Sequence, residues 1–141
     1  MPKIDSGLLA PSMSSVRPIE FSRRTLRRAE RAVACSPFGF ALFQALQQEA
    51  VPLRAIAGRQ GSSHGYTDQT LSETTADDEL IWLIQVGVLR REVDGQGITD
   101  RFRLTPLGGQ LVEVWSQTGY PKADWLSHLR NLRSRWFHLP F

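Results

Sequence analysis

The stretch LRREVDGQGITDRFRLTPLG, Leu89–Gly108, decides the fold. On either side of Asp94–Gly97 the residues fall into two alternating sets, as in strands: Leu89, Arg91 and Val93 against Arg90 and Glu92, and Phe102 and Leu104 against Arg101 and Arg103. Asp94–Gly97 tolerates the positive φ needed for a tight chain reversal. Thr105 and Pro106 then suit the N-cap and the first position of a helix. The stretch therefore predicts a β-hairpin that leads directly into a helix, with these residues on one apolar face: Leu107, Leu111, Val114 and Trp115.

A basic amphipathic helix is predicted near the start of the chain. Ser22 is a suitable N-cap, and Leu26, Ala29 and Val33 recur at helical spacing. This spacing leaves the arginines of the segment on the opposite arc, where they form a dense positive patch.

Three further helices are predicted between this basic helix and the hairpin. The first covers Pro37–Gln48, with Ser36 as its N-cap and proline at its first position. The second is a short helix within Pro52–Arg59, and the third covers Thr75–Val86 and is capped by Thr74 or Thr75. The carboxylates of the third helix, Asp77, Asp78 and Glu79, complement the positive end of its dipole.

The two ends of the chain differ from its middle. Residues 1–18 are rich in serine and proline and are predicted to be a flexible lead-in, and residues 19–141 to be one domain. After Pro121, apolar residues at helical spacing predict a last helix that offers a surface to a protein partner or to a second copy of the chain: Trp125, Leu129, Leu132 and Trp136.

Composition limits the class of protein. The chain has 141 residues, 41% of them hydrophobic, and a net charge of +3, which leans towards acidic partners. Cys35 is the single cysteine and cannot form an internal disulfide, and we expect no signal peptide, so the sequence predicts a cytoplasmic protein. No apolar run is long enough to cross a bilayer, so no membrane partner is expected.

The sequence predicts no catalysis, no cofactor and no metal site. His64, His128 and His138 do not fall into zinc-ligand spacing with Cys35. Asp77, Asp78 and Glu79 are adjacent, which spreads them around a helix instead of gathering them. An enzyme is therefore the third choice, behind two kinds of binding protein.

The run ADDELIWLIQVGVLRREVDGQGITDRFRLTPLGGQLVEVW resembles the second half of a winged-helix domain. The whole chain also resembles a family of small uncharacterised cyanobacterial proteins. The first resemblance implies an α+β, mostly helical winged helix, with a two-stranded wing hairpin and extra N- and C-terminal helices. It further implies that the helix over Thr75–Val86 reads base edges while the wing contacts the DNA backbone or minor groove.

The sequence departs from this pattern on the implied recognition helix, which carries carboxylates and no arginine or lysine. Carboxylates are repelled by a groove lined with phosphates, so ordinary major-groove reading is in doubt. The candidate nucleic-acid contacts are therefore the arginines of the first helix and the wing, with two threonines: Arg23, Arg24, Arg27, Arg28, Arg31, Thr74, Thr75, Arg90, Arg91, Arg101 and Arg103.

Two functions remain open from the sequence. The leading one is nucleic-acid binding in transcriptional regulation through these arginines. The alternative is a protein-interaction adapter that uses the winged-helix fold without binding DNA. Glu92, Asp94 and Asp100 are interspersed among the wing arginines and can pair with them across the hairpin, which would remove those arginines from a nucleic-acid surface.

Overall fold

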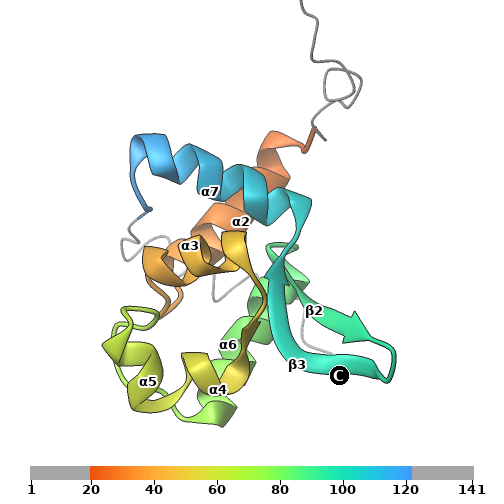
Figure 1. Ribbon diagram of the computed structural model, residues 1–141. Helices are drawn as coiled ribbons and strands as arrows, with labels where there is room; N and C mark the ends of the chain where they lie inside the picture. The colour runs from red at the N-terminus through yellow and green to blue at the C-terminus, as the bar shows by residue number, and fades with distance from the viewer. Residues whose placement is uncertain (1–19, 122–141) are drawn as a thin grey trace, which may run out of the picture.

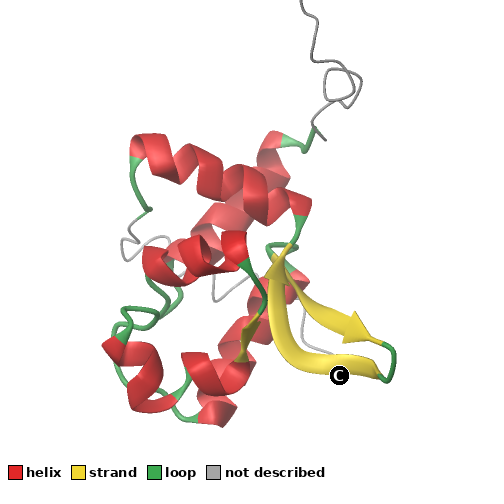
Figure 2. Ribbon diagram, viewed as in Figure 1, coloured by secondary structure: helices red, strands yellow, loops and turns green. Residues whose placement is uncertain are grey.

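The computed structural model describes residues 20–121, which form helices and one small sheet (Figure 1, Figure 2). The predicted lead-in and the predicted last helix, with its Trp125, Leu129, Leu132 and Trp136, lie outside these residues. In chain order the elements are α2 (Arg23–Ala34), α3 (Phe40–Gln48), β1 (Val51–Pro52), α4 (Leu53–Ile56), α5 (Gly58–Ser63), α6 (Glu73–Gln85), β2 (Leu89–Asp94), β3 (Gly97–Leu104) and α7 (Pro106–Thr118).

The predicted hairpin is present and forms most of the sheet. Strands β2 and β3 pair antiparallel from Leu89↔Leu104 to Asp94↔Gly97, and Gly97 adopts a φ of 118° at the reversal. Strand β1 pairs with the other side of β3, which gives the strand order β1-β3-β2. The α+β, mostly helical fold class with a two-stranded wing is thereby confirmed, and the element order agrees with a winged helix.

The hairpin is bent by an irregularity in β3. Residues 99–101 of β3 lie opposite the single residue Glu92 of β2, because the register passes from Arg91↔Phe102 to Val93↔Ile98. The Thr99 hydroxyl donates to the Glu92 carbonyl and accepts from the Arg101 N–H, so it satisfies groups that the bulge leaves out of the ladder. Figure 1 shows the resulting curve of β3, which carries the turn away from the helices.

Helix α7 starts as predicted. The Thr105 side chain accepts from the Gly108 N–H, and Pro106 is at the first helical position. Gly108 brings this first turn against the hairpin base, since a Cβ there would lie 2.3 Å from the Val88 carbonyl oxygen. Of the predicted apolar face, Leu107, Leu111 and Trp115 are buried, whereas Val114 is 50% exposed because it lies at the edge of the buried arc.

Helix α2 also begins as predicted, because the Ser22 side chain accepts from the Thr25 N–H. Its small face, Ala29, Ala32 and Val33, is fully buried against α6 and α7. Small side chains allow these helices to approach closely, so α2 is part of the core and not an appended arm.

The predicted start of α3 is wrong. The helix begins at Phe40, with Gly39 as its N-cap, and not at Pro37. The Ser36 hydroxyl instead donates to the Val33 carbonyl at the end of α2, and Phe38 forms a β-bridge with Thr67. A contact distant in sequence therefore keeps these residues extended and delays the helix.

The short helix predicted within Pro52–Arg59 is two helices, α4 and α5. The break lies at Ala57, and Gly58, which follows it, has a φ of 69° and donates its N–H to the Leu71 carbonyl. Helix α5 then continues to Ser63. The Gly58 hydrogen bond ties the break to the residues that precede α6.

The predicted cap of α6 is also wrong. The N-cap is Ser72, whose side chain accepts from the Thr75 N–H, and neither Thr74 nor Thr75 caps the helix. The helix therefore starts at Glu73, and Asp77 and Asp78 fall in its second turn. The end of this helix agrees with the prediction, because Gly87 follows the C-cap with a φ of 87°.

The core lies where α2, α3, α6 and α7 meet the root of the sheet, and Phe43 and Phe102 are fully buried within it. Tyr120 closes the end of α7 onto α3. Its hydroxyl donates to the Phe38 carbonyl at 2.6 Å, and its ring packs against Phe40, Phe43 and Trp115. Burial raises the pKa of Tyr120 above its ordinary value of 10.0, so the phenol is neutral in the folded protein.

Candidate interaction surface

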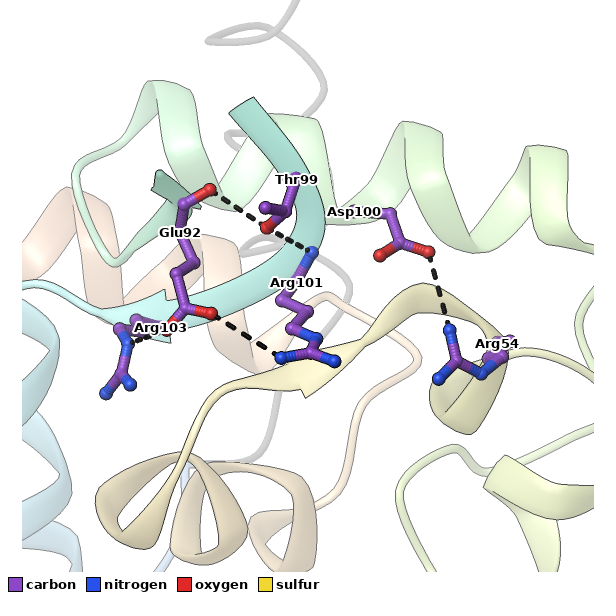
Figure 3. Close-up of polar contacts among 6 residues, drawn as sticks. All are labelled: Arg54, Glu92, Thr99, Asp100, Arg101 and Arg103. Carbon is purple, nitrogen blue, oxygen red and sulfur yellow. Dashed lines mark hydrogen bonds and ion pairs between the residues drawn. The ribbon is translucent and has the colours of Figure 1, made fainter. Parts of the chain in front are cut away.

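Most arginines of the wing, which consists of β2, β3 and their turn, are in ion pairs. The Glu92 carboxylate lies 2.7 Å from Arg103 Nε and 3.9 Å from Arg101 Nη1 (Figure 3). Asp100 lies 3.9 Å from Arg54 of α4, although both of these side chains are largely exposed. The pairing of wing arginines with wing carboxylates that the sequence allowed is present at Glu92.

Arg91 joins the wing to α6 instead of facing solvent. Its Nη2 donates to Asp77 Oδ1 at 3.0 Å, and its guanidinium carbon lies 4.9 Å from the centre of the Phe102 ring. The two charged side chains are 27% and 32% exposed. Asp77, in the second turn of the implied recognition helix, is therefore paired with Arg91, one of the predicted phosphate contacts.

Arg90 is the exception in the wing. It is exposed and forms no ion pair with any other residue in the range 20–121. Three of the four predicted wing arginines are thus paired with carboxylates, and one is not.

The charges of α6 and the wing add up to a negative surface. The two elements together carry four arginines and seven carboxylates, four of them on α6 and three on the wing, so their net charge is −3. The described residues as a whole contain eleven arginines, no lysine and twelve carboxylates. The positive net charge of the full sequence therefore comes from residues 1–19 and 122–141.

The tip of the wing is apolar. Val93 and Ile98 are cross-strand neighbours beside the turn, and they are 64% and 75% exposed. Sequence reasoning missed this pair, because it treated Val93 as one member of an alternating strand. The available signal was an aliphatic residue on each side of Asp94–Gly97.

Residues 19–135 match the sequence profile of the Npun_F0494-like family, which covers most of the chain. The chain belongs to this family. No curated protein and no solved structure matches it. The predicted resemblance to a family of small proteins is confirmed, and the match includes every helix and strand described above.

In this Npun_F0494-like protein, the arginines of α2 do not form one continuous patch. Arg23, Arg24 and Arg27 are exposed, and none forms an ion pair with another described residue. Arg31 is half-buried, and Arg28 is turned inward with its guanidinium carbon 5.7 Å from the centre of the Trp82 ring. The exposed basic patch is therefore reduced to the first two turns of α2.

The acidic residue of α2 does not neutralise this patch through an ion pair in the described region. Glu30 Oε2 instead accepts from the indole Nε1 of Trp115, at 3.1 Å. This hydrogen bond connects α2 to α7 and directs the carboxylate towards the helix interface.

The two predicted threonine contacts are exposed at the start of α6. The Thr75 hydroxyl accepts from the Ser72 hydroxyl, at 3.0 Å, so it belongs to the capping arrangement. Both threonines are accessible to a partner, but they are followed by the carboxylates of the next turn.

Neither a metal site nor a membrane-spanning helix is present within residues 20–121. No group of histidine, cysteine and carboxylate side chains in this range is arranged to hold a metal ion. The His64 ring stacks on Tyr66, and its Nδ1 lies 2.7 Å from the Gln60 carbonyl. Among the helices that the structure describes, none is long and apolar enough to cross a membrane.

Proposed function

We propose that this Npun_F0494-like protein is a non-enzymatic winged-helix module that binds another protein through α6 and the wing. The observation that carries the proposal is the balance of seven carboxylates against four arginines on these two elements. In winged-helix proteins that bind DNA, these same elements meet the duplex. Phosphate neutralisation supplies most non-specific affinity, so a net charge of −3 opposes that use.

The charge balance carries more weight than the ion pairs themselves. An exposed ion pair contributes only about 0–1 kcal/mol, so phosphates can compete for Arg101 or Arg103 at small cost. Releasing those arginines, however, leaves Glu92 unpaired beside the phosphates. The repulsion from the carboxylates therefore remains whichever way the arginines turn.

The wing tip supplies the contact that favours a protein partner. Val93 and Ile98 form an exposed apolar pair at the end of a projecting hairpin, with the acidic Asp94 beside them. An apolar centre with charged surroundings is the ordinary anatomy of a protein interface. The partner expected from this chemistry offers an apolar pocket bordered by basic side chains.

A binding experiment on the full chain tests the proposal. The protein is titrated into a fluorescently labelled generic duplex of 30 base pairs at 50 mM salt, at up to about 100 µM protein, a range that covers typical non-specific affinities. We expect no binding that depends on α6 or the wing, so the double variant Arg90→Ala with Arg101→Ala will match the wild type. A loss of DNA binding in this double variant would overturn the proposal.

A second experiment tests the protein contact directly. Partners are cross-linked in native extract treated with nuclease, identified, and remade as pure protein for titration. Val93→Ser with Ile98→Ser is expected to weaken the pure complex at least about tenfold, because apolar anchors dominate such interfaces. Val114→Ser is the matched control, since Val114 is a 50% exposed valine on α7. Equal affinity of the tip variant and the control would contradict the proposed surface.

Nucleic-acid binding in transcriptional regulation is the second candidate, and one observation favours it. Arg23, Arg24 and Arg27 are exposed, and none is in an ion pair with another described residue. Binding through these residues predicts a steep loss of DNA affinity between 50 and about 200 mM salt. Arg23→Ala with Arg27→Ala is expected to lower the slope by about 2, while the Arg90→Ala with Arg101→Ala variant leaves it unchanged.

Cellular location and assembly are parts of the same proposal. The lone Cys35 fits a reducing compartment, so we place the protein in the cytoplasm. A homodimer through Trp125, Leu129, Leu132 and Trp136 stays a prediction, which sedimentation of Trp125→Ser with Trp136→Ser beside the wild type would test.

A further inference from the structure

A pocket of about 480 Å³ opens between the start of α2, the end of α6 and the start of α7. Apolar side chains form much of its lining, among them Phe21, Val86, Pro106 and Leu107. Among the described residues that line the pocket, Arg28 is the one charged side chain. The volume falls within the range of small-molecule sites, roughly 300–1,000 Å³, which are also mostly apolar with a few polar groups.

Two hydrogen-bond donors of Arg28 have no acceptor among the described residues. Its Nε and Nη2 are buried, and neither has a hydrogen-bond partner in the described part of the chain. These two nitrogens form the edge of a guanidinium that binds a carboxylate through two parallel hydrogen bonds. The Trp82 ring, 5.7 Å away, attracts the charge through its π face but accepts no in-plane hydrogen bond. Buried charged groups are normally paired, so this guanidinium lacks its usual complement.

The helix end beside Arg28 does not replace an anion. Gln85, Val86 and Gly87 at the end of α6 also line the pocket, and a helix C-terminus carries roughly half a negative charge. This partial negative charge stabilises the guanidinium and repels an anion, but it is smaller than the full positive charge of the arginine. The net field in the pocket therefore favours one negative group.

Thr25 offers a second polar contact. Its hydroxyl oxygen accepts from the Ser22 hydroxyl at 2.8 Å, which leaves the Thr25 proton to donate. Thr25 and Arg28 lie three residues apart on α2, on the same side of the helix, and both line the pocket. The two donors can therefore converge on one oxygen-bearing group.

We propose that this pocket binds a small molecule with one carboxylate on an apolar body, such as a medium-chain or aromatic carboxylic acid. Arg28 holds the carboxylate, Thr25 donates to it, and the apolar body lies against Phe21, Pro106 and Leu107. Binding requires the Arg28 side chain to rotate so that its buried Nε and Nη2 face the ligand. The site is independent of the macromolecule that the wing contacts.

The test uses octanoate and phenylacetate as probes, with octanol and phenylacetamide as uncharged counterparts. Binding to the full chain is followed through the Nε–Hε resonance of Arg28 by NMR and through the melting temperature. We expect both carboxylates at millimolar concentration to shift the resonance and raise the melting temperature, and the uncharged counterparts to do neither. Arg28→Met keeps the length of the stem and is expected to weaken binding about 10- to 100-fold.

The controls separate binding from structure. Arg27→Met removes an exposed arginine on the same helix and is expected to leave the affinity unchanged. Arg28→Lys keeps the charge without the two-pronged edge, so it will bind with intermediate affinity even if Arg28→Met does not fold. The proposal fails if neither carboxylate moves the Arg28 resonance in the wild type, if the uncharged counterparts bind equally, or if Arg27→Met loses as much affinity as Arg28→Lys.

Discussion

Replacing Arg91 with alanine tests whether this residue belongs to the fold or to a binding surface. The change removes the 3.0 Å hydrogen bond to Asp77 and the stacking of the guanidinium on the fully buried Phe102. Because the pair is about one-third exposed, its contribution is near the upper end for surface pairs, about 1 kcal/mol. The cation–π contact adds about 0.5–1 kcal/mol.

We therefore expect Arg91→Ala to lower the free energy of unfolding by about 1.5–2 kcal/mol. For a chain of this size, this loss corresponds to a fall in melting temperature of roughly 4–8 °C. Arg90→Ala is the matched control, because the neighbouring Arg90 is exposed and unpaired among the described residues, and its loss will be within about 0.5 kcal/mol.

Urea unfolding of Arg91→Ala, Asp77→Ala and the double variant, followed by tryptophan fluorescence, measures the coupling between the two side chains. We expect a coupling energy of about 1 kcal/mol that largely persists in 0.5 M salt, because the pair is partly shielded from solvent. A coupling below about 0.3 kcal/mol, or an equal loss in Arg90→Ala, would refute the view that Arg91 is held by α6.

Three further changes test the local structure. Tyr120→Phe is expected to lower the free energy of unfolding by about 1 kcal/mol at neutral pH. Burial raises the pKa of Tyr120 in the folded state, so its contribution to stability is complete below the unfolded-state pKa of 10.0 and is lost as the pH rises above that value. Alkaline unfolding curves should therefore be flatter for Tyr120→Phe, and parallel curves would contradict this. Gly108→Ala will destabilise the protein by roughly 1–3 kcal/mol, because the added Cβ lies 2.3 Å from a carbonyl oxygen. Gly109→Ala will stabilise α7 by about 0.5–1 kcal/mol, because the added Cβ has no atom within 4 Å. Thermal melts in which both variants shift the melting temperature in the same direction would be inconsistent with this packing. Ser72→Ala is expected to lower the free energy of unfolding by about 1 kcal/mol, and Thr74→Ala by less than half of that. A larger loss for Thr74→Ala than for Ser72→Ala in urea unfolding would indicate that the threonine caps α6.

The parts of the fold that were predictable have their causes within a few residues. The caps at Ser22 and Thr105 depend on hydrogen bonds to residues three positions away, and the reversal at Asp94–Gly97 depends on its own backbone. Two of the errors have distant causes. Phe38 forms a β-bridge with Thr67, and Gly58 donates to the Leu71 carbonyl, so contacts distant in sequence changed the helix bounds that local signals favoured.

The candidate surface was predictable in composition but not in arrangement. The carboxylates among the wing arginines indicated pairing, and Glu92 pairs as that pattern allowed. Nothing in the sequence indicated that Asp77 contacts Arg91, fourteen residues away, or that Arg28 lies against Trp82. These contacts depend on how α6 packs against the wing and α2, which no local pattern encodes.

The bend in β3 bears on how a chain with an exposed apolar tip can avoid stacking against its copies. Strand β2 is an outer strand of the described sheet, so one row of its backbone groups pairs with no described strand. The three residues opposite Glu92 curve the ladder, and a curved edge does not template the flat, repeated stacking from which fibrils grow. The hairpin can therefore present Val93 and Ile98 to a selective receptor while its own geometry discourages polymerisation.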